Sequence, residues 1–99
     1  MFFVNIIKSY RDVITICDSE LLGKKFEEGR FQLDIKEGFY KGKKETKEGV
    51  IKIIRKFSIE DATFNIVGEN SIKAALDANI IKKDEIKRIQ GIPFALVLV

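Results

Sequence analysis

The residues best suited to bind a ligand form a basic run in the middle of the chain. Between Lys41 and Lys56 there are seven basic and two acidic residues, a net charge of +5, whereas the whole chain carries +3. Lysine and arginine neutralise phosphate groups and release counterions, and the rings of Phe39 and Tyr40 are of the kind that stack on unpaired bases. The candidate nucleic-acid-binding residues are Phe39, Tyr40, Lys41, Lys43, Lys44, Lys47, Lys52, Arg55 and Lys56.

The same run has a second interpretation. The lysines can form a solvated loop and helix face, and the two aromatic rings can pack beneath that loop. A second basic group follows later in the chain and would enlarge a binding surface only if it folds nearby: Lys82, Lys83, Lys87 and Arg88. Both interpretations stay open from the sequence.

Histidine is absent and Cys17 is the single cysteine, which excludes several chemistries. Ser-His-Asp catalysis, Cys-His catalysis and an internal disulfide are impossible, and one cysteine without histidine argues against a structural zinc site within one chain. We expect Cys17 to be a small buried hydrophobe, because the neighbouring Asp18 opposes thiolate formation. We therefore predict no catalytic residue, no metal site and no cofactor.

An enzyme that uses carboxylates and lysines would need Asp18, Glu20, Lys24 and Glu69 to meet in one cleft. Helix capping explains Asp18 and Glu20 more simply, since carboxylates satisfy or favour the N-terminal N–H groups of a helix. The segment Val67–Asn70 links a strand to a helix. We interpret it as a structural turn, because it lacks the glycine spacing of nucleotide-binding loops and its glutamate would repel phosphate.

Three functions follow from these residues. The first is a non-enzymatic module that binds RNA or a ribonucleoprotein through the basic helix face. The second is a protein-interaction subunit, such as a homodimer, that pairs through a sheet edge or through the exposed face of the strand beginning at Phe31. The third is the small carboxylate and lysine enzyme.

Length and composition indicate one soluble domain over residues 1–99, with 45% hydrophobic and 33% charged residues. No run reaches the roughly 20 apolar residues of a membrane helix, and the apolar start at Met1–Ile7 lacks the basic end and length of a signal peptide. With a lone cysteine, this favours the cytoplasm. Sixteen isoleucines and 14 lysines against two glutamines are typical of hyperthermophiles, and equally of an AT-rich genome.

Periodicity predicts an α+β fold. Alternating strands and helices favour a two-layer sandwich with a mixed sheet of about five to six strands and three helices, in the order ββαβαβαββ. We place Phe31, Leu33 and Ile35 toward the core, Thr46 as the cap of the second helix, and Asn79 at the end of the third. The predicted strands cover residues 2–8, 13–17, 31–36, 62–67, 86–90 and 94–99, and the predicted helices cover about 18–29, 46–57 and 69–78.

Four short motifs resemble a known family in their order and spacing. They are Cys17-Asp-Ser-Glu-Leu-Leu-Gly-Lys24, Phe39-Tyr-Lys-Gly42, Asn65-Ile-Val-Gly-Glu69 and Ile89-Gln-Gly-Ile-Pro93. With the alanine-rich helix after Glu69, they make nearly the whole chain similar to a family of short archaeal proteins, domain of unknown function 424 (DUF424).

The resemblance implies an archaeal cytoplasmic protein without an established activity, associated with translation and ribosomal genes. It also implies a His-Ala-Gln tripeptide after the Gly-Ile-Pro turn, where this chain has Phe94-Ala95-Leu96. A histidine-based activity common to the whole family is therefore not expected.

Overall fold

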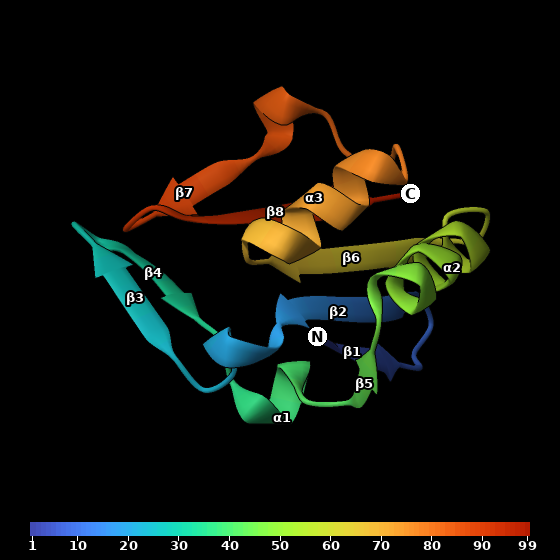
Figure 1. The fold of residues 1–99 in the computed structure, drawn as a ribbon, viewed down its shortest axis with the longest axis horizontal. Coiled ribbons are helices and arrows are strands. Elements are labelled where there is room, and N and C mark those ends of the chain that lie inside the picture. The colour runs from blue at the N-terminus through green and yellow to red at the C-terminus, as the bar shows by residue number, and fades with distance from the viewer.

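The computed structural model describes residues 1–99, which fold around a six-stranded mixed sheet with the strand order β5-β1-β2-β6-β8-β7. The strands β3 and β4 form a separate antiparallel hairpin (Figure 1). Within the large sheet only β2 and β6 run parallel, and the other neighbours are antiparallel. The elements are β1 (Phe2–Ile7), β2 (Asp12–Asp18), η1 (Ser19–Leu21), β3 (Lys25–Glu28), β4 (Phe31–Asp34), α1 (Glu37–Tyr40), β5 (Lys43–Glu45), α2 (Lys47–Phe57), β6 (Ala62–Val67), α3 (Glu69–Asp77), η2 (Lys83–Glu85), β7 (Lys87–Ile89) and β8 (Ile92–Leu98).

The larger core lies between the sheet and the two longer helices, α2 and α3, which cover one face (Figure 1). Strand side chains alternate between faces, so Ile14 and Ile16 of β2 and Phe64 and Ile66 of β6 all point to the helices and are buried. On α2, Ile54 belongs to the stripe that packs against them. This layer fixes the exposed side of α2, which carries much of the basic run.

A smaller core lies on the opposite face, at the carboxyl ends of β2 and β6. Cys17 and Val67 form its floor, and Leu21, Leu33 and Tyr40 cover it from η1, β4 and α1. The tip of the β3–β4 hairpin is held by a hydrogen bond from Gln90, whose backbone N–H donates to the Glu28 carboxylate at 2.8 Å. The hairpin is thereby tied to the turn between β7 and β8.

The α+β class and the mixed sheet are confirmed. The N-terminal hairpin, the strand at 62–67 and the last two helices lie within one or two residues of the predicted bounds. Thr46 caps α2, since its Oγ1 accepts a hydrogen bond from Gly49 N–H at 3.2 Å. Asn79 takes the left-handed conformation that ends the segment after α3, with φ of 61°. The strand β8 lies inside the sheet, as its apolar run predicted.

The predicted helix at 18–29 is wrong. The chain forms only the short η1 and then turns at Gly23, whose φ is +84°, into β3. Gly23 N–H donates to the carbonyl of Ile35 at 2.8 Å, so this segment pairs with the β4 side of the chain. Three apolar residues in a short window fit a strand as well as a helix, and pairing with a distant partner decided between them.

Three further details differ from the prediction. Phe31 is 67% exposed, although Leu33 and Ile35 are buried as expected. The turn at 37–42 contains the short helix α1, which buries Tyr40. The strand β5, which pairs with β1, was not predicted, because three consecutive charged residues carry no strand signal.

Candidate nucleic-acid interface and the cleft beside α3

The basic run forms one connected surface at an edge of the sheet, because β5 pairs with β1 and leads directly into α2. All seven basic side chains belong to residues that are exposed to solvent. We define the α2–β5 basic surface by its members: Lys41, Lys43, Lys44, Lys47, Lys52, Arg55 and Lys56.

The members of this surface do not all face the same way. Lys52, Arg55 and Lys56 lie on the side of α2 opposite its buried stripe. Lys43 lies opposite Val4 in the β-ladder and is therefore on the helix side of the sheet. Lys44 is on the other side, with its Nζ 5.7 Å from the centre of the Phe3 ring. The positive charge thus wraps around the sheet edge.

Most of these charges lack a carboxylate partner. Lys47 pairs with Asp77 of α3, with Nζ and Oδ2 2.8 Å apart, and the other six members form no ion pair. The hydrogen bond from Lys47, together with its positive charge, lowers the pKa of Asp77. The surface therefore keeps most of the positive field that the sequence predicts.

The two aromatic residues of the predicted site serve the core. Tyr40 is 7% exposed, and burial, followed by the effect of Cys17, raises its pKa to about 12. Phe39 is partly buried and packs edge-to-face on Tyr40, with ring centres 5.2 Å apart. Tyr40 is therefore not available to stack on a base, and the alternative interpretation, packing beneath the loop, describes it.

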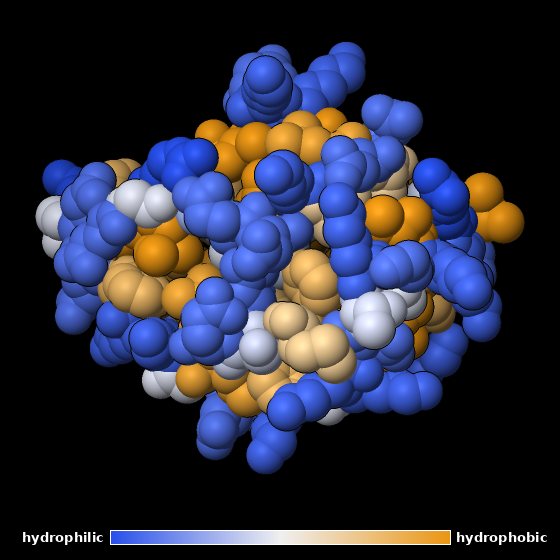
Figure 2. Space-filling model, in the orientation of Figure 1, coloured by the Kyte–Doolittle hydropathy of each residue, from blue (hydrophilic) through white to orange (hydrophobic).

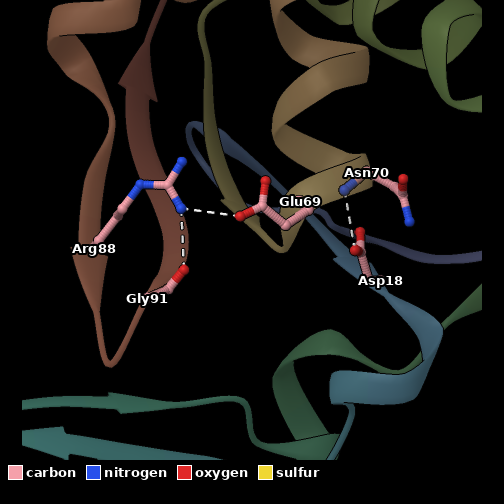
Figure 3. Close-up of polar contacts among 5 residues, drawn as sticks. All are labelled: Asp18, Glu69, Asn70, Arg88 and Gly91. Carbon is pink, nitrogen blue, oxygen red and sulfur yellow. Dashed lines mark hydrogen bonds and ion pairs between the residues drawn. The ribbon is translucent and has the colours of Figure 1, made fainter.

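The proposed acid–base set does not form a shared cleft. Asp18 is 2% exposed, and its carboxylate accepts hydrogen bonds from the first turn of α3. The Glu69 side chain points away from Asp18 and pairs with Arg88 at 2.9 Å (Figure 3). Glu20 and Lys24 are exposed and form no ion pair. Asp18 caps a helix, as predicted, but the helix is α3 and not the one expected directly after it.

Cys17 has no exposed surface. Burial, followed by the negative charge of Asp18, raises the pKa of its thiol to about 11. A thiol with this pKa stays protonated near neutral pH and is a poor nucleophile. Cys17 is thus the buried residue that the sequence predicts.

A second polar site, which the sequence did not reveal, lies beside α3. A cleft of about 460 Å³ opens between α3 and the segment that includes η2 and β7. Lys73, Lys83 and Arg88 line it, from three separate elements. Figure 2 shows apolar surface between hydrophilic side chains in this region, over α3 and the segment leading to β7. Lys83 and Arg88 belong to the second basic group of the sequence, but Lys73 had no signal beyond its charge.

No three His, Cys, Asp or Glu side chains gather where they could hold a metal ion. None of the helices has the length and apolar character needed to cross a membrane.

The sequence over residues 7–99 matches the family model described as "Protein of unknown function (DUF424)". The chain belongs to the DUF424 family. Its fold resembles the crystal structure of an uncharacterized conserved protein from Methanopyrus kandleri, with a TM-score of 0.86 and 26% identity. That match covers 99% of this chain and 90% of the other. No curated protein matches the sequence.

The motifs that carry the resemblance to DUF424 have structural roles here. The Phe39 carbonyl accepts hydrogen bonds from Asn5 Nδ2 and Thr15 Oγ1, which ties α1 to the sheet. A Cβ atom at Gly42 would collide with the carbonyl of Val4. A Cβ atom at Gly68 would likewise collide with the Asp18 carboxylate. These motif residues therefore position elements, and the solvent-facing basic residues remain as candidates for binding.

Proposed function

We propose that this chain is a cytoplasmic archaeal protein that binds RNA, alone or in a ribonucleoprotein, without catalysing a reaction. The observation that carries the proposal is the set of six unpaired cations on the α2–β5 basic surface. Such a surface favours a polyanion, and its exposed lysines suit a phosphate backbone better than a single buried anion. The burial of Tyr40 argues against recognition by stacking on that ring.

Binding of this kind depends strongly on salt. Each neutralised phosphate releases counterions, so the logarithm of the binding constant falls linearly with the logarithm of salt concentration. For about four phosphate contacts, a rise from 50 to 200 mM salt is expected to weaken binding on the order of 100-fold. Little sequence preference is expected, because phosphate contacts position a nucleic acid without reading its bases.

The test compares retention of a structured RNA at low and moderate salt by three proteins. The first is the natural chain, and the second carries Lys43→Glu, Lys44→Glu, Lys52→Glu and Arg55→Glu. The control carries the same charge change on exposed residues around the β3–β4 hairpin, through Lys24→Glu, Lys25→Glu, Arg30→Glu and Lys36→Glu. We expect loss of RNA in the second protein and a smaller decrease in the control. Equal retention by all three would refute the proposal.

One observation favours a second candidate function, a homodimer that forms through the open part of the sheet. Leu96 and Leu98 of β8 are 60% and 67% exposed, on the face opposite α2 and α3. Their ladder neighbours on β6, Asn65 and Thr63, are uncharged. Arg11 borders the patch, since its Nε donates to Thr63 Oγ1 at 3.0 Å. The exposed leucines themselves form an apolar surface that can meet its own copy.

Sedimentation at micromolar concentration tests this candidate. We expect the natural chain to dimerise and the variant with Leu96→Lys and Leu98→Lys to be monomeric. The matched variant with Phe31→Lys and Ile59→Lys changes two exposed hydrophobic residues outside the patch and adds the same two positive charges. A monomeric natural chain removes the candidate.

A further inference from the structure

The cleft beside α3 combines an apolar wall with a positively charged rim. Ile72, Leu76 and Ile86 supply the three apolar side chains among its lining residues. Its volume of about 460 Å³ is within the roughly 300–1,000 Å³ that small-molecule sites usually occupy. Such a site suits a ligand with a flat, weakly polar part and a separate anionic group.

The side-chain charges of the lining favour an anion. Lys73, Lys83 and Arg88 contribute three positive charges, and Glu69 contributes one negative charge. Glu69 is already paired with Arg88, whose Nη1 also donates to the Gly91 carbonyl at 3.0 Å (Figure 3). Lys73 and Lys83 form no ion pair. Two free ammonium groups and one oriented guanidinium therefore face the cleft.

The N-terminus of α3 itself does not supply this attraction. The N–H groups of Asn70 and Ser71 are occupied by the Asp18 carboxylate, at 3.0 and 2.8 Å. An incoming anion would have to displace a buried carboxylate that is 2% exposed. The cationic side chains thus remain as the anion-binding groups.

A second hollow of about 370 Å³ adjoins the cleft and shares Asn70 and Lys73 with it. Lys47 and Thr46, at the start of α2, line its other side. Basic side chains therefore follow one another from the α2–β5 basic surface, across Lys47 and Lys73, to Lys83 and Arg88, with the Asp77 carboxylate paired to Lys47 at the first step. A chain of phosphates bound at α2 can reach the cleft along this path.

We infer that the cleft beside α3 binds a nucleoside monophosphate unit. The phosphate is held by Lys73, Lys83 and Arg88, and the base lies against Ile72, Leu76 and Ile86. Such a unit has two sources, a nucleotide within RNA or a free nucleotide. In the first case the inference deepens the proposed function and rests on it; in the second it stands alone.

The test titrates isotope-labelled protein with adenosine monophosphate, uridine monophosphate, adenosine and inorganic phosphate, and follows the backbone amide signals. We expect saturable shifts in α3 and residues 83–88 with both monophosphates. Adenosine and inorganic phosphate each lack one half of the ligand and are expected to bind at least about fivefold more weakly. The variant with Lys73→Gln and Lys83→Gln should lose about tenfold in affinity for the monophosphates.

The control variant, Lys24→Gln with Lys25→Gln, removes two positive charges from residues that do not line the cleft and should bind as the natural chain does. All of these substitutions are at exposed positions, and the amide spectrum reports directly whether each variant is folded. No saturable shift up to about 10 mM monophosphate, or equal binding by both double variants, would overturn the inference.

A short single-stranded RNA separates the two sources. If Lys73→Gln with Lys83→Gln weakens both the RNA and the monophosphates, the unit comes from RNA. If it weakens the monophosphates alone, a free nucleotide is the ligand. If the protein retains no RNA but still binds the monophosphates, the proposed function is wrong and the inference about the cleft stands. If the protein retains RNA through the α2–β5 basic surface but does not bind the monophosphates, the inference about the cleft is wrong and the proposed function stands.

Discussion

Asp18 caps α3, a helix that begins about fifty residues later in the sequence, by accepting hydrogen bonds from Asn70 and Ser71. Its Oδ1 accepts hydrogen bonds from both the N–H and the Oγ of Ser71, at 2.8 and 2.7 Å. Its Oδ2 accepts the N–H of Asn70 at 3.0 Å. The helix's own N-cap residue, Gly68, has no side chain to do this. The end of β2 thereby fixes the start of α3, and with it one wall of the cleft.

Removal of this cap is expected to destabilise the protein. Asp18→Ala deletes the acceptor of three hydrogen bonds and leaves the buried Ser71 hydroxyl without its partner. The expected loss in free energy of unfolding is about 2–4 kcal/mol. Asp18→Asn keeps one acceptor oxygen and should lose about half as much. Urea denaturation measures both, and a loss below about 0.5 kcal/mol for Asp18→Ala would contradict the role assigned to this carboxylate.

Gly68→Ala is expected to be costly for two separate reasons. The backbone at Gly68 has φ of 113° and ψ of 154°, a region open almost only to glycine, and an added Cβ would collide with the Asp18 carboxylate. We expect a loss of at least about 3 kcal/mol in thermal or urea unfolding. Gly29→Ala is the control, because Gly29 also has a positive φ, of 62°, but has open space around it. A similar loss for both variants would show that the collision with Asp18 contributes nothing.

Local sequence signals located most elements of the large sheet and both long helices. Thr46 is an N-cap residue and marks the start of α2. The β-branched residues of β1, β2 and β6 favour strands. The structure of the segment after Asp18 could not be predicted from local sequence signals. Its capping residue serves α3, Phe26 pairs with Leu33 of β4, and Leu21 packs in the smaller core, so the signals that predicted a helix there have distant explanations.

The candidate site was predictable only where its residues are consecutive. The α2–β5 basic surface comes from one stretch of sequence, and its charge could be counted directly. Lys73, Lys83 and Arg88 come from α3, η2 and β7, and they meet because α3 packs against β8 while β7 pairs with β8. The sequence left open whether Tyr40 is a contact residue or packs beneath the loop, because aromatic rings near lysines look the same whether they face solvent or a core.

Two donors share the Phe39 carbonyl, which makes their separate contributions measurable. Thr15 Oγ1 lies 2.9 Å from this oxygen and Asn5 Nδ2 lies 3.1 Å from it. We expect Thr15→Val and Asn5→Ala each to cost about 1 kcal/mol, because the remaining donor still satisfies the carbonyl. The double variant should cost about 1 kcal/mol more than the sum, since the carbonyl then has neither donor. Strictly additive losses in urea denaturation would show that the two hydrogen bonds act independently.

The buried thiol gives the protein a predicted sensitivity to alkali. The pKa of Cys17 is raised from 9.0 to about 11, first by burial and then by the charge of Asp18. Because the folded state disfavours the thiolate, this contribution to stability is complete below pH 9 and is lost as pH rises toward 11. Burial is the main cause that raises the pKa of Tyr40 from 10.0 to about 12, so Tyr40 lowers the free energy of unfolding further at higher pH. The free energy of unfolding is therefore expected to fall from about pH 9 upward.

Two measurements check this last expectation. Thermal unfolding between pH 7 and pH 10 should show the decline in the natural chain. In Cys17→Ala, whose absolute stability is lower because of the lost packing, the decline should begin about one pH unit higher, where only Tyr40 contributes. At pH 8, a neutral alkylating reagent should label Cys17 at least about 100-fold more slowly in the folded protein than in urea, since the folded thiol is both inaccessible and protonated. Equal labelling rates in the two states would mean that the Cys17 thiol is not buried and that its pKa is not raised. The smaller core would then open readily to solvent.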